Sequence, residues 1–144
     1  MKTRVFAIIH LDGKFLLIRE TNRNFKNQWY FPGGMLEPSE DLASGLMREV
    51  KEEAGYEIGI NGICFIQYHN LPISRKGLYV YCSARIIGGD VKTIADEHSM
   101  EAKWFYSNEI ATLETRGNLP ELMQQYADEL PLLSTTQLHL NQDR

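Results

Sequence analysis

Residues 34–56, GMLEPSEDLASGLMREVKEEAGY, contain the signals that decide the fold. They predict a helix that begins at Ser39, whose hydroxyl suits an N-cap, and ends at Ala54, because Gly55 readily terminates a helix. Glu40 and Asp41 fall in the first turn, where the helix dipole favours negative charge. With about 100° of rotation per residue, one arc is apolar and should pack on a sheet. This arc contains Ala43, Leu46, Met47, Val50 and Ala54.

A second arc of this helix is acidic. Glu49, Glu52 and Glu53 lie within about 100° of one another, and at ~4 Å and an effective dielectric near 20 each pair of carboxylates costs about 4 kcal/mol. A divalent cation would relieve this repulsion, and oxygen ligands favour Mg²⁺ or Mn²⁺ over zinc. Gly45 leaves room for an approaching group, and Arg48 lies within side-chain reach of Glu52. The alternative is an ordinary solvated helix face.

Strand signals flank the helix on both sides. Two apolar runs at residues 5–11 and 14–19, separated by Asp12-Gly13, predict a largely buried β-hairpin. A polar loop (residues 20–28), a short strand (29–31) and a tight turn (32–34) follow. Beyond the helix, we expect strands at residues 58–68 and 78–87, a break at Gly88-Gly89, a last strand at 102–106 and a second helix at 119–129.

The order β-β-β-α-β-β-β-α predicts an α/β fold in which helices pack on a mixed sheet as a sandwich. A chain of 144 residues fits a single domain over residues 1–144, with residues 130–144 as a candidate C-terminal tail. Its 43% hydrophobic and 24% charged residues are typical of a globular protein.

The formal charge of −4 gives no support for binding nucleic acid through a basic surface. A polyanionic substrate would therefore need a cation or local Arg and Lys groups. Cys64 and Cys82 lie apart in apolar stretches, which favours buried thiols over a disulfide or a zinc site. The N-terminus runs directly into a strand pattern and no apolar run could span a bilayer, so we expect a cytoplasmic protein without a membrane partner. The sequence leaves the oligomeric state open, with a homodimer among the options.

Residues 34–56 resemble the Nudix box, G-x5-E-x7-R-E-U-x-E-E-x-G-U, where U is a bulky aliphatic residue. All seven fixed positions match at the right spacing: Gly34, Glu40, Arg48, Glu49, Glu52, Glu53 and Gly55. Tyr56 departs from the final aliphatic position, which should alter core packing more than chemistry. The segments WYFPGG (29–34) and WFYSNEI (104–110) also resemble the flanking segments of the family. The resemblance implies a Nudix-type α/β/α sandwich.

The resemblance also implies roles for individual residues. Glu49, Glu52 and Glu53 would hold one or more Mg²⁺ ions, or Mn²⁺, with help from the backbone carbonyl of Gly33. Arg48 would orient one of these glutamates, and Glu40 would hold the loop that wraps the helix. We assign Gly34 to the substrate site.

The general base varies within the family. Glu49 is our first choice, and Glu97 or Glu101, just ahead of the last strand, is the alternative. Glu97 is also a candidate metal ligand, although an acid in a loop is most often only solvated. The four histidines show no pairing pattern and receive no assignment.

The substrate pocket is less evident in the sequence. Alternation along residues 78–87 makes Tyr79, Tyr81 and Arg85 candidates to line a cleft, where a tyrosine would stack on a base and the arginine would meet a phosphate. The alternative is a solvated sheet face. Pro72 occupies a position where members of the family that cleave ADP-ribose often carry proline, and other members act on oxidised nucleotides, so several substrates stay in consideration.

We therefore expect a metal-dependent hydrolase that cleaves a phosphoanhydride bond in a nucleoside diphosphate or triphosphate derivative or a similar small organic pyrophosphate. A rival hypothesis is a catalytically idle Nudix-fold module that binds a nucleotide-like ligand. A third is an α/β domain whose acidic helix is only surface. The intact set of Arg48, Glu49, Glu52 and Glu53 favours the enzyme.

Overall fold

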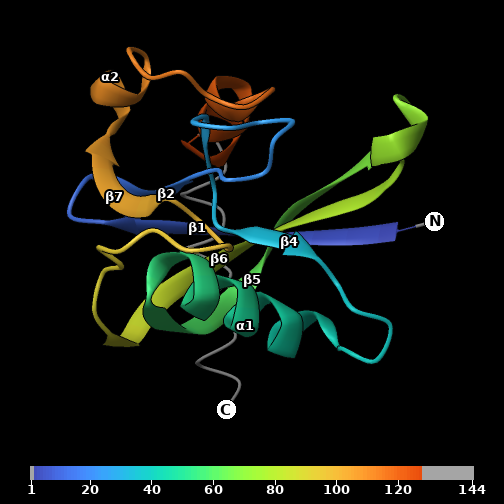
Figure 1. The fold of residues 1–144 in the computed structure, drawn as a ribbon, viewed down its shortest axis with the longest axis horizontal. Helices are drawn as coiled ribbons and strands as arrows, with labels where there is room; N and C mark the ends of the chain where they lie inside the picture. Colours follow the sequence, from blue (N-terminus) through green and yellow to red (C-terminus); the bar gives the residue numbers. More distant parts are fainter. Residues whose placement is uncertain (1, 128–144) are drawn as a thin grey trace.

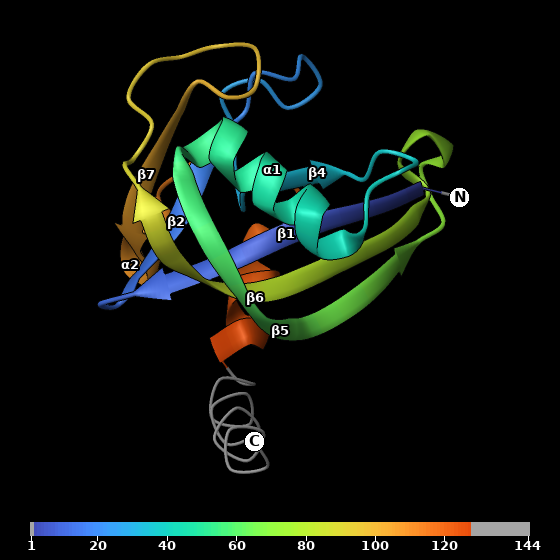
Figure 2. The same ribbon diagram turned by 90° about the horizontal axis from the view of Figure 1, so that it is seen from below.

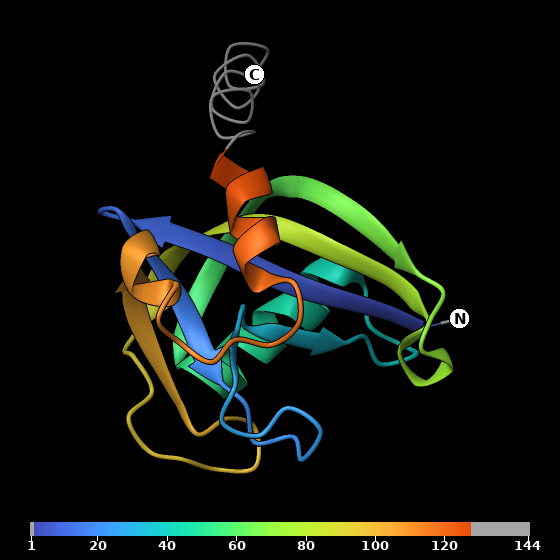
Figure 3. The same cartoon turned by 90° about the horizontal axis from the view of Figure 1, so that it is seen from above.

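The computed structural model describes residues 2–127, which form an α/β sandwich around a mixed β-sheet. Helix α1 (Leu42–Ala54) covers one face of the sheet, and a helix at residues 119–127 covers the other (Figure 1). Figures 2 and 3, seen from below and from above, show these two helices on opposite sides of the central strands. The predicted fold class is confirmed. The predicted tail at residues 130–144 and the end of the second helix lie outside the described residues.

Within residues 2–127, seven strands pair into the sheet in the order β3-β2-β1-β6-β5, with β4 paired to β1 and β7 to β2. The strands are β1 (Lys2–Leu11), β2 (Lys14–Arg19), β3 (Trp29–Tyr30), β4 (Gly33–Met35), β5 (Tyr56–His69), β6 (Gly77–Gly89) and β7 (Glu101–Tyr106). β1 runs parallel to β6, and the other named strand pairs are antiparallel. The predicted hairpin forms, but β1 and β2 pair only next to their turn, at His10↔Phe15 and Leu11↔Lys14. The two strands then diverge into separate branches of the sheet.

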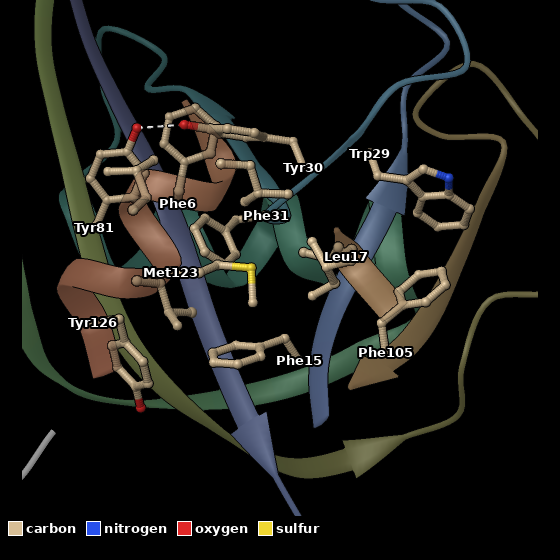
Figure 4. Close-up of a cluster of buried hydrophobic side chains, with 14 of the residues drawn as sticks. Phe6, Phe15, Leu17, Trp29, Tyr30, Phe31, Tyr81, Phe105, Met123 and Tyr126 are labelled. Carbon is tan, nitrogen blue, oxygen red and sulfur yellow. Dashed lines mark hydrogen bonds between the residues drawn. The ribbon is translucent and has the colours of Figure 1, made fainter. Parts of the chain in front are cut away.

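Alternation of side chains along β1 divides the interior into two cores, one on each face of the sheet. The core under α1 includes Val5, Ala7, Ile9, Leu46 and Val50. The opposite core is rich in aromatic side chains and includes Phe6, Tyr30, Phe31, Tyr81 and Met123 (Figure 4). A central strand that is buried on both faces carries apolar side chains at every position, as residues 5–9 do. Cys64 and Cys82 form no disulfide; Cys82 is buried and Cys64 is half-buried.

Helix α1 begins later than the sequence suggested. Its N-cap is Asp41, whose carboxylate accepts a 2.8 Å hydrogen bond from the backbone N–H of Ser44, so the predicted cap at Ser39 is wrong. Residues 37–40 instead form a turn closed by the bond from the Glu40 N–H to the Glu37 carbonyl. The predicted end is confirmed, because Gly55 adopts a φ of 88°. On the apolar arc, Leu46, Val50 and Ala54 are buried, whereas Ala43 and Met47 are exposed.

Several elements differ from the local sequence signals. The predicted turn at Gly33-Gly34 is the strand β4, because these residues pair with Phe6 and Val5 of β1. Gly88 and Gly89, the predicted break, are the last two residues of β6 and still pair with the start of β5. Two short elements were not predicted, a 3-10 turn η1 (Ile73–Arg75) and α2 (Ser107–Ile110). Each long-range pairing depends on a partner far along the chain, which local patterns do not reveal.

Candidate active site

Glu53 is a buried carboxylate at the meeting point of α1 and β4. Its side chain lies on the inner side of the last turn of α1, and the residue is only 7% exposed. Its Oε1 atom accepts a 2.7 Å hydrogen bond from the backbone N–H of Gly33. The turn at residues 96–99 also anchors this end of the helix, because the Ser99 hydroxyl donates to the Glu53 carbonyl. Glu53 is therefore fixed between two backbone segments.

Glu49, one turn earlier on α1, lies beside the next residue of β4. A methyl group placed on Gly34 would sit 2.8 Å from Oε1 of Glu49, so this glycine leaves space for the carboxylate. Glu49 and Glu53 both line a cavity of about 390 Å³, together with Gly33 and Gly34. The structure thus brings four predicted site residues together at one cavity.

Burial makes both carboxylates harder to ionise. Burial raises the pKa of Glu53 well above its usual range, and the neighbouring charge of Glu49 raises it further. Burial also raises the pKa of Glu49, while the guanidinium of Arg48 opposes this shift. Two desolvated acids at one cavity cost folding free energy, which a bound cation would offset.

Arg48 contacts three carboxylates, of which Glu40 is the nearest. Its Nε and Nη2 atoms donate to the two oxygens of Glu40 at 2.6 and 2.8 Å, a bidentate pair. Weaker contacts of 3.3 Å reach Glu49 and Glu52. Glu40 also accepts a hydrogen bond from the Glu37 N–H, and the two interactions lower its pKa to about 2. Arg48 therefore ties the loop ahead of α1 to the acidic face, and Gly45 gives room for Leu36 and Glu40 of this loop.

Glu52 does not line the cavity with the other two glutamates. Its carboxylate lies 3.3 Å from Nη1 of Arg48 and 3.2 Å from Nδ1 of His98. Accordingly, within residues 2–127 no three His, Cys, Asp or Glu side chains are arranged to hold a metal ion. The available donors still fit a hard cation, because Glu49 and Glu53 present carboxylate oxygens at the same cavity. Glu52 would have to leave Arg48 and His98 to join them.

The two alternative bases occupy different places. Glu97 lines the cavity, with a side chain that is 84% exposed and 3.5 Å from Nε2 of His98. Glu101 lies on β7 and forms a 2.6 Å ion pair with Arg19 of β2. The structure therefore brings Glu97 to the site and leaves Glu101 outside the cavity.

The residues proposed for substrate binding are only partly brought together. Tyr79 and Tyr81 line a second cavity of about 200 Å³, as does Pro72. Tyr81 is fully buried, and its hydroxyl lies 2.6 Å from that of Tyr30 (Figure 4). The alternative of a solvated tyrosine face is wrong, because β6 is buried on both faces at residues 79–84. Trp29 and Phe31 are buried as well.

Arg85 lies outside both cavities. It is exposed on β6, and its Nη1 atom donates to Oδ1 of Asn61 at 2.6 Å. Six residues of strand separate it from Tyr79, which is about 20 Å at ~3.3 Å per residue. Its predicted contact with a phosphate has no support in this arrangement.

Sequence reasoning missed five residues with ionisable side chains at the main cavity: Arg4, Glu20, Arg75, His98 and Arg116. Arg116 and Glu20 form a buried ion pair of 2.9 Å although 96 residues separate them. No motif marks these positions. The available signal was weak: Glu20 follows directly after a buried strand, and Arg116 precedes the second helix.

The sequence matches the family model of the NUDIX domain over residues 1–126. The chain belongs to the Nudix family. This Nudix chain is 34% identical over 123 residues to the human 8-oxo-dGDP phosphatase NUDT18. The aligned region covers 82% of the chain and 37% of that protein. It is 31% identical over 111 residues to an ADP-ribose pyrophosphatase of Methanocaldococcus jannaschii, covering 76% of the chain and 64% of that protein. It thus spans less than two-thirds of either relative.

Solved structures agree with this assignment. A Nudix hydrolase from Nitrosomonas europaea superposes with a TM-score of 0.76 at 27% identity, over 88% of each chain. The Nudix domain of Shewanella oneidensis NrtR gives a TM-score of 0.71 at 17% identity, which shows a shared fold alone. Within residues 2–127, no helix is long and apolar enough to cross a bilayer.

Proposed function

We propose that this Nudix chain hydrolyses a phosphoanhydride bond in a nucleoside diphosphate or triphosphate derivative, with Mg²⁺ or Mn²⁺ as cofactor. The observation that carries this proposal is the pair of buried carboxylates, Glu49 and Glu53, beside the backbone of Gly33 and Gly34. Such a pair is unfavourable in the protein alone and suits a cation-dependent site. The names of the two relatives, an 8-oxo-dGDP phosphatase and an ADP-ribose pyrophosphatase, support the same bond type.

Glu49 and Glu53 would hold the cation, with Gly33, Glu52 and Glu97 as further candidate ligands. When bound, the ion would neutralise charge on the phosphates and acidify the attacking water. In the reaction, the water oxygen forms a new bond to phosphorus, the bridging P–O bond breaks, and the proton of the water passes to a carboxylate. Glu49 is the preferred acceptor, because burial raises its pKa towards the range of an effective base. Glu97 is the alternative acceptor, with His98 3.5 Å away.

Arg48 and Glu40 would act as positioning residues. Their bidentate contact fixes the loop ahead of α1, and Arg48 in turn contacts Glu49 and Glu52. A carboxylate held in this way has few rotamers available. Such rigidity matters for catalysis, because a displacement of about 1 Å in an active site lowers the rate ~10²-fold.

A panel of substrates tests the proposal. ADP-ribose, oxidised nucleoside diphosphates and triphosphates, dinucleoside polyphosphates and simple pyrophosphates would be incubated with Mg²⁺, and phosphate release would be measured after treatment of the products with a phosphatase. We expect turnover that EDTA abolishes and added Mg²⁺ restores. Full turnover in metal-free buffer would rule out the cation-dependent reaction.

Two variants with the same chemical change sharpen this test. Glu53→Gln removes the buried carboxylate, whereas Glu57→Gln changes a glutamate on β5 whose side chain is 61% exposed. We expect turnover to fall at least about 10²-fold in the first variant and to stay near wild type in the second. Ligand binding without turnover of any substrate would instead support the idle module.

A further inference from the structure

Three arginines from distant parts of the chain line the same cavity as Glu49 and Glu53. Arg4 lies in β1, Arg75 ends the turn η1, and Arg116 precedes the helix at residues 119–127. Their convergence is a result of the fold, since no two of them are near in sequence. A cavity with acids and arginines together suits a ligand that carries both bound cations and free anionic oxygens.

Only one of the three arginines is paired with a carboxylate within residues 2–127. Arg116 forms an ion pair with Glu20 at 2.9 Å. Arg4 is only 5% exposed, and its Nη1 atom donates to the carbonyl of Arg75 at 3.4 Å. Among the described residues, neither Arg4 nor Arg75 has a carboxylate within ion-pair distance. Burial lowers the pKa of Arg4, and the charges of Arg75 and Arg116 lower it further, so an anion at this position would relieve the strain of like charges.

Aromatic rings hold the guanidinium groups in place. The guanidinium carbon of Arg116 lies 4.2 Å from the ring centroid of Phe25 and 4.6 Å from that of Tyr30. That of Arg75 lies 4.9 Å from the Phe25 centroid, and that of Arg4 lies 5.3 Å from the Tyr79 centroid. Guanidinium groups stacked in this way lose little entropy when they bind an oxyanion.

Arg75 and Arg116 also line the second, aromatic cavity, next to Phe25, Tyr79 and Tyr81. They therefore lie where the carboxylate cavity and the aromatic cavity meet. A ligand that extends from one cavity into the other would pass its linking phosphate beside these two side chains.

We propose that Arg4, Arg75 and Arg116 form an anion site that binds a phosphoryl group of the substrate and so sets which phosphoanhydride bond faces Glu49 and Glu53. The phosphate at this site is the one that joins the scissile bond to a flat aromatic moiety in the second cavity. The arginines are thus specificity-determining residues for the reaction, and this role rests on the proposed function.

Binding of inorganic pyrophosphate in EDTA buffer, measured by calorimetry, tests the anion site without a cation and without turnover. The variant Arg75→Gln should raise Kd about tenfold, the usual loss for one charge-assisted hydrogen bond. Arg85→Gln is the matched control, because it makes the same chemical change at an exposed arginine that lies outside both cavities. Equal Kd values for wild type and Arg75→Gln would overturn the proposal.

Arg116→Gln leaves Glu20 without its buried partner, so it would be combined with Glu20→Gln to preserve folding. Loss of pyrophosphate affinity in this double variant, at unchanged melting temperature, is the expected result. Retained affinity in both this variant and Arg75→Gln would exclude the site.

The products from a nucleoside triphosphate give an independent readout. Wild type should release one product pair, either nucleoside monophosphate with pyrophosphate or nucleoside diphosphate with phosphate, whereas Arg75→Gln should give both pairs, with a raised KM. A variant with the wild-type product ratio and KM would contradict the assignment. If wild type binds pyrophosphate in EDTA but turns over no substrate, the anion site stands and the proposed hydrolase function fails.

Discussion

The backbone N–H of Gly33 donates a 2.7 Å hydrogen bond to Oε1 of Glu53, and this bond joins strand β4 to the buried end of α1. The bond holds a carboxylate where burial and the neighbouring Glu49 both disfavour its ionised form. One hydrogen bond only partly offsets such a cost. Without a bound cation, the buried carboxylates therefore lower the stability of the folded protein.

Glu53→Gln should stabilise the metal-free protein while it removes activity. The amide keeps the acceptor for the Gly33 N–H and no longer requires a charge to be buried, so the gain in unfolding free energy should be about 1–3 kcal/mol near neutral pH. The ordinary pKa of the group is 4.5 and the folded value is higher. Above that ordinary pKa the unfolded state binds fewer protons than the folded state, and the wild-type protein loses stability as the pH rises.

The gain in unfolding free energy of Glu53→Gln over wild type should therefore increase from about pH 5 to about pH 8. Urea unfolding in EDTA at both pH values, with Glu57→Gln as the exposed control, measures it. A variant that is less stable than wild type at the higher pH would show that the Glu53 carboxylate contributes favourably without a cation.

Magnesium should raise the melting temperature of the wild-type protein. An ion that binds only the folded state at about 100 times its Kd adds ~2.7 kcal/mol, or roughly 10 °C for a domain near this size. The shift should be at least halved in Glu53→Gln, which has lost one carboxylate ligand. Differential scanning fluorimetry over a Mg²⁺ series checks this, and an unchanged wild-type melting temperature would argue against a cation at these carboxylates.

The pair Arg48–Glu40 should behave as a unit in catalysis. Arg48→Gln and Glu40→Gln each break the same bidentate contact, so each should lower turnover about 10–100-fold, and the double variant should be little worse than the more affected single variant. Lys51→Gln, on the same helix, is the control, because Lys51 contacts exposed Glu57 at 3.8 Å and the Gly55 carbonyl at 3.3 Å and does not line the cavity. Fully additive losses would mean that the two residues act separately.

The end of α1 and its acidic arc could be predicted from the sequence, whereas its start and its surroundings could not. The spacing of Glu49, Glu52 and Glu53 placed all three on one arc, and Glu49 and Glu53 do meet at the cavity. Glu52 turns instead to Arg48 and to His98, which a loop far along the chain supplies. Helix geometry fixes the direction in which a side chain leaves the backbone, whereas the groups it contacts decide the position of its carboxylate.

The same distinction explains the substrate residues. Alternation along β6 suggested one buried and one open face, but the helix at residues 119–127 covers the face of Tyr79 and Tyr81. The parallel pairing of β1 with β6 places Arg4 at the cavity, and the loop before that helix places Arg116 there. Neither arrangement leaves a local pattern in the sequence, so the acidic half of the site was predictable and the basic half was not.

Gly33→Ala and Gly34→Ala should separate folding from catalysis at adjacent positions. Gly33 has a φ of 150°, and an added methyl group would overlap the carbonyl oxygen of Val5 and lie 2.7 Å from Cα of Phe6. The backbone of β1 would have to move, so Gly33→Ala should lose more than about 1 kcal/mol of stability. Gly34 has no positive φ, and the three heavy atoms nearest to its added methyl group would all belong to the Glu49 carboxylate, at 2.8 to 3.0 Å. Gly34→Ala should therefore keep a near wild-type melting temperature and lose about 10²-fold in turnover, because a displaced carboxylate near the reacting phosphate is costly. Thermal unfolding and steady-state kinetics on both variants decide the matter: full turnover in Gly34→Ala would place the reaction away from Glu49.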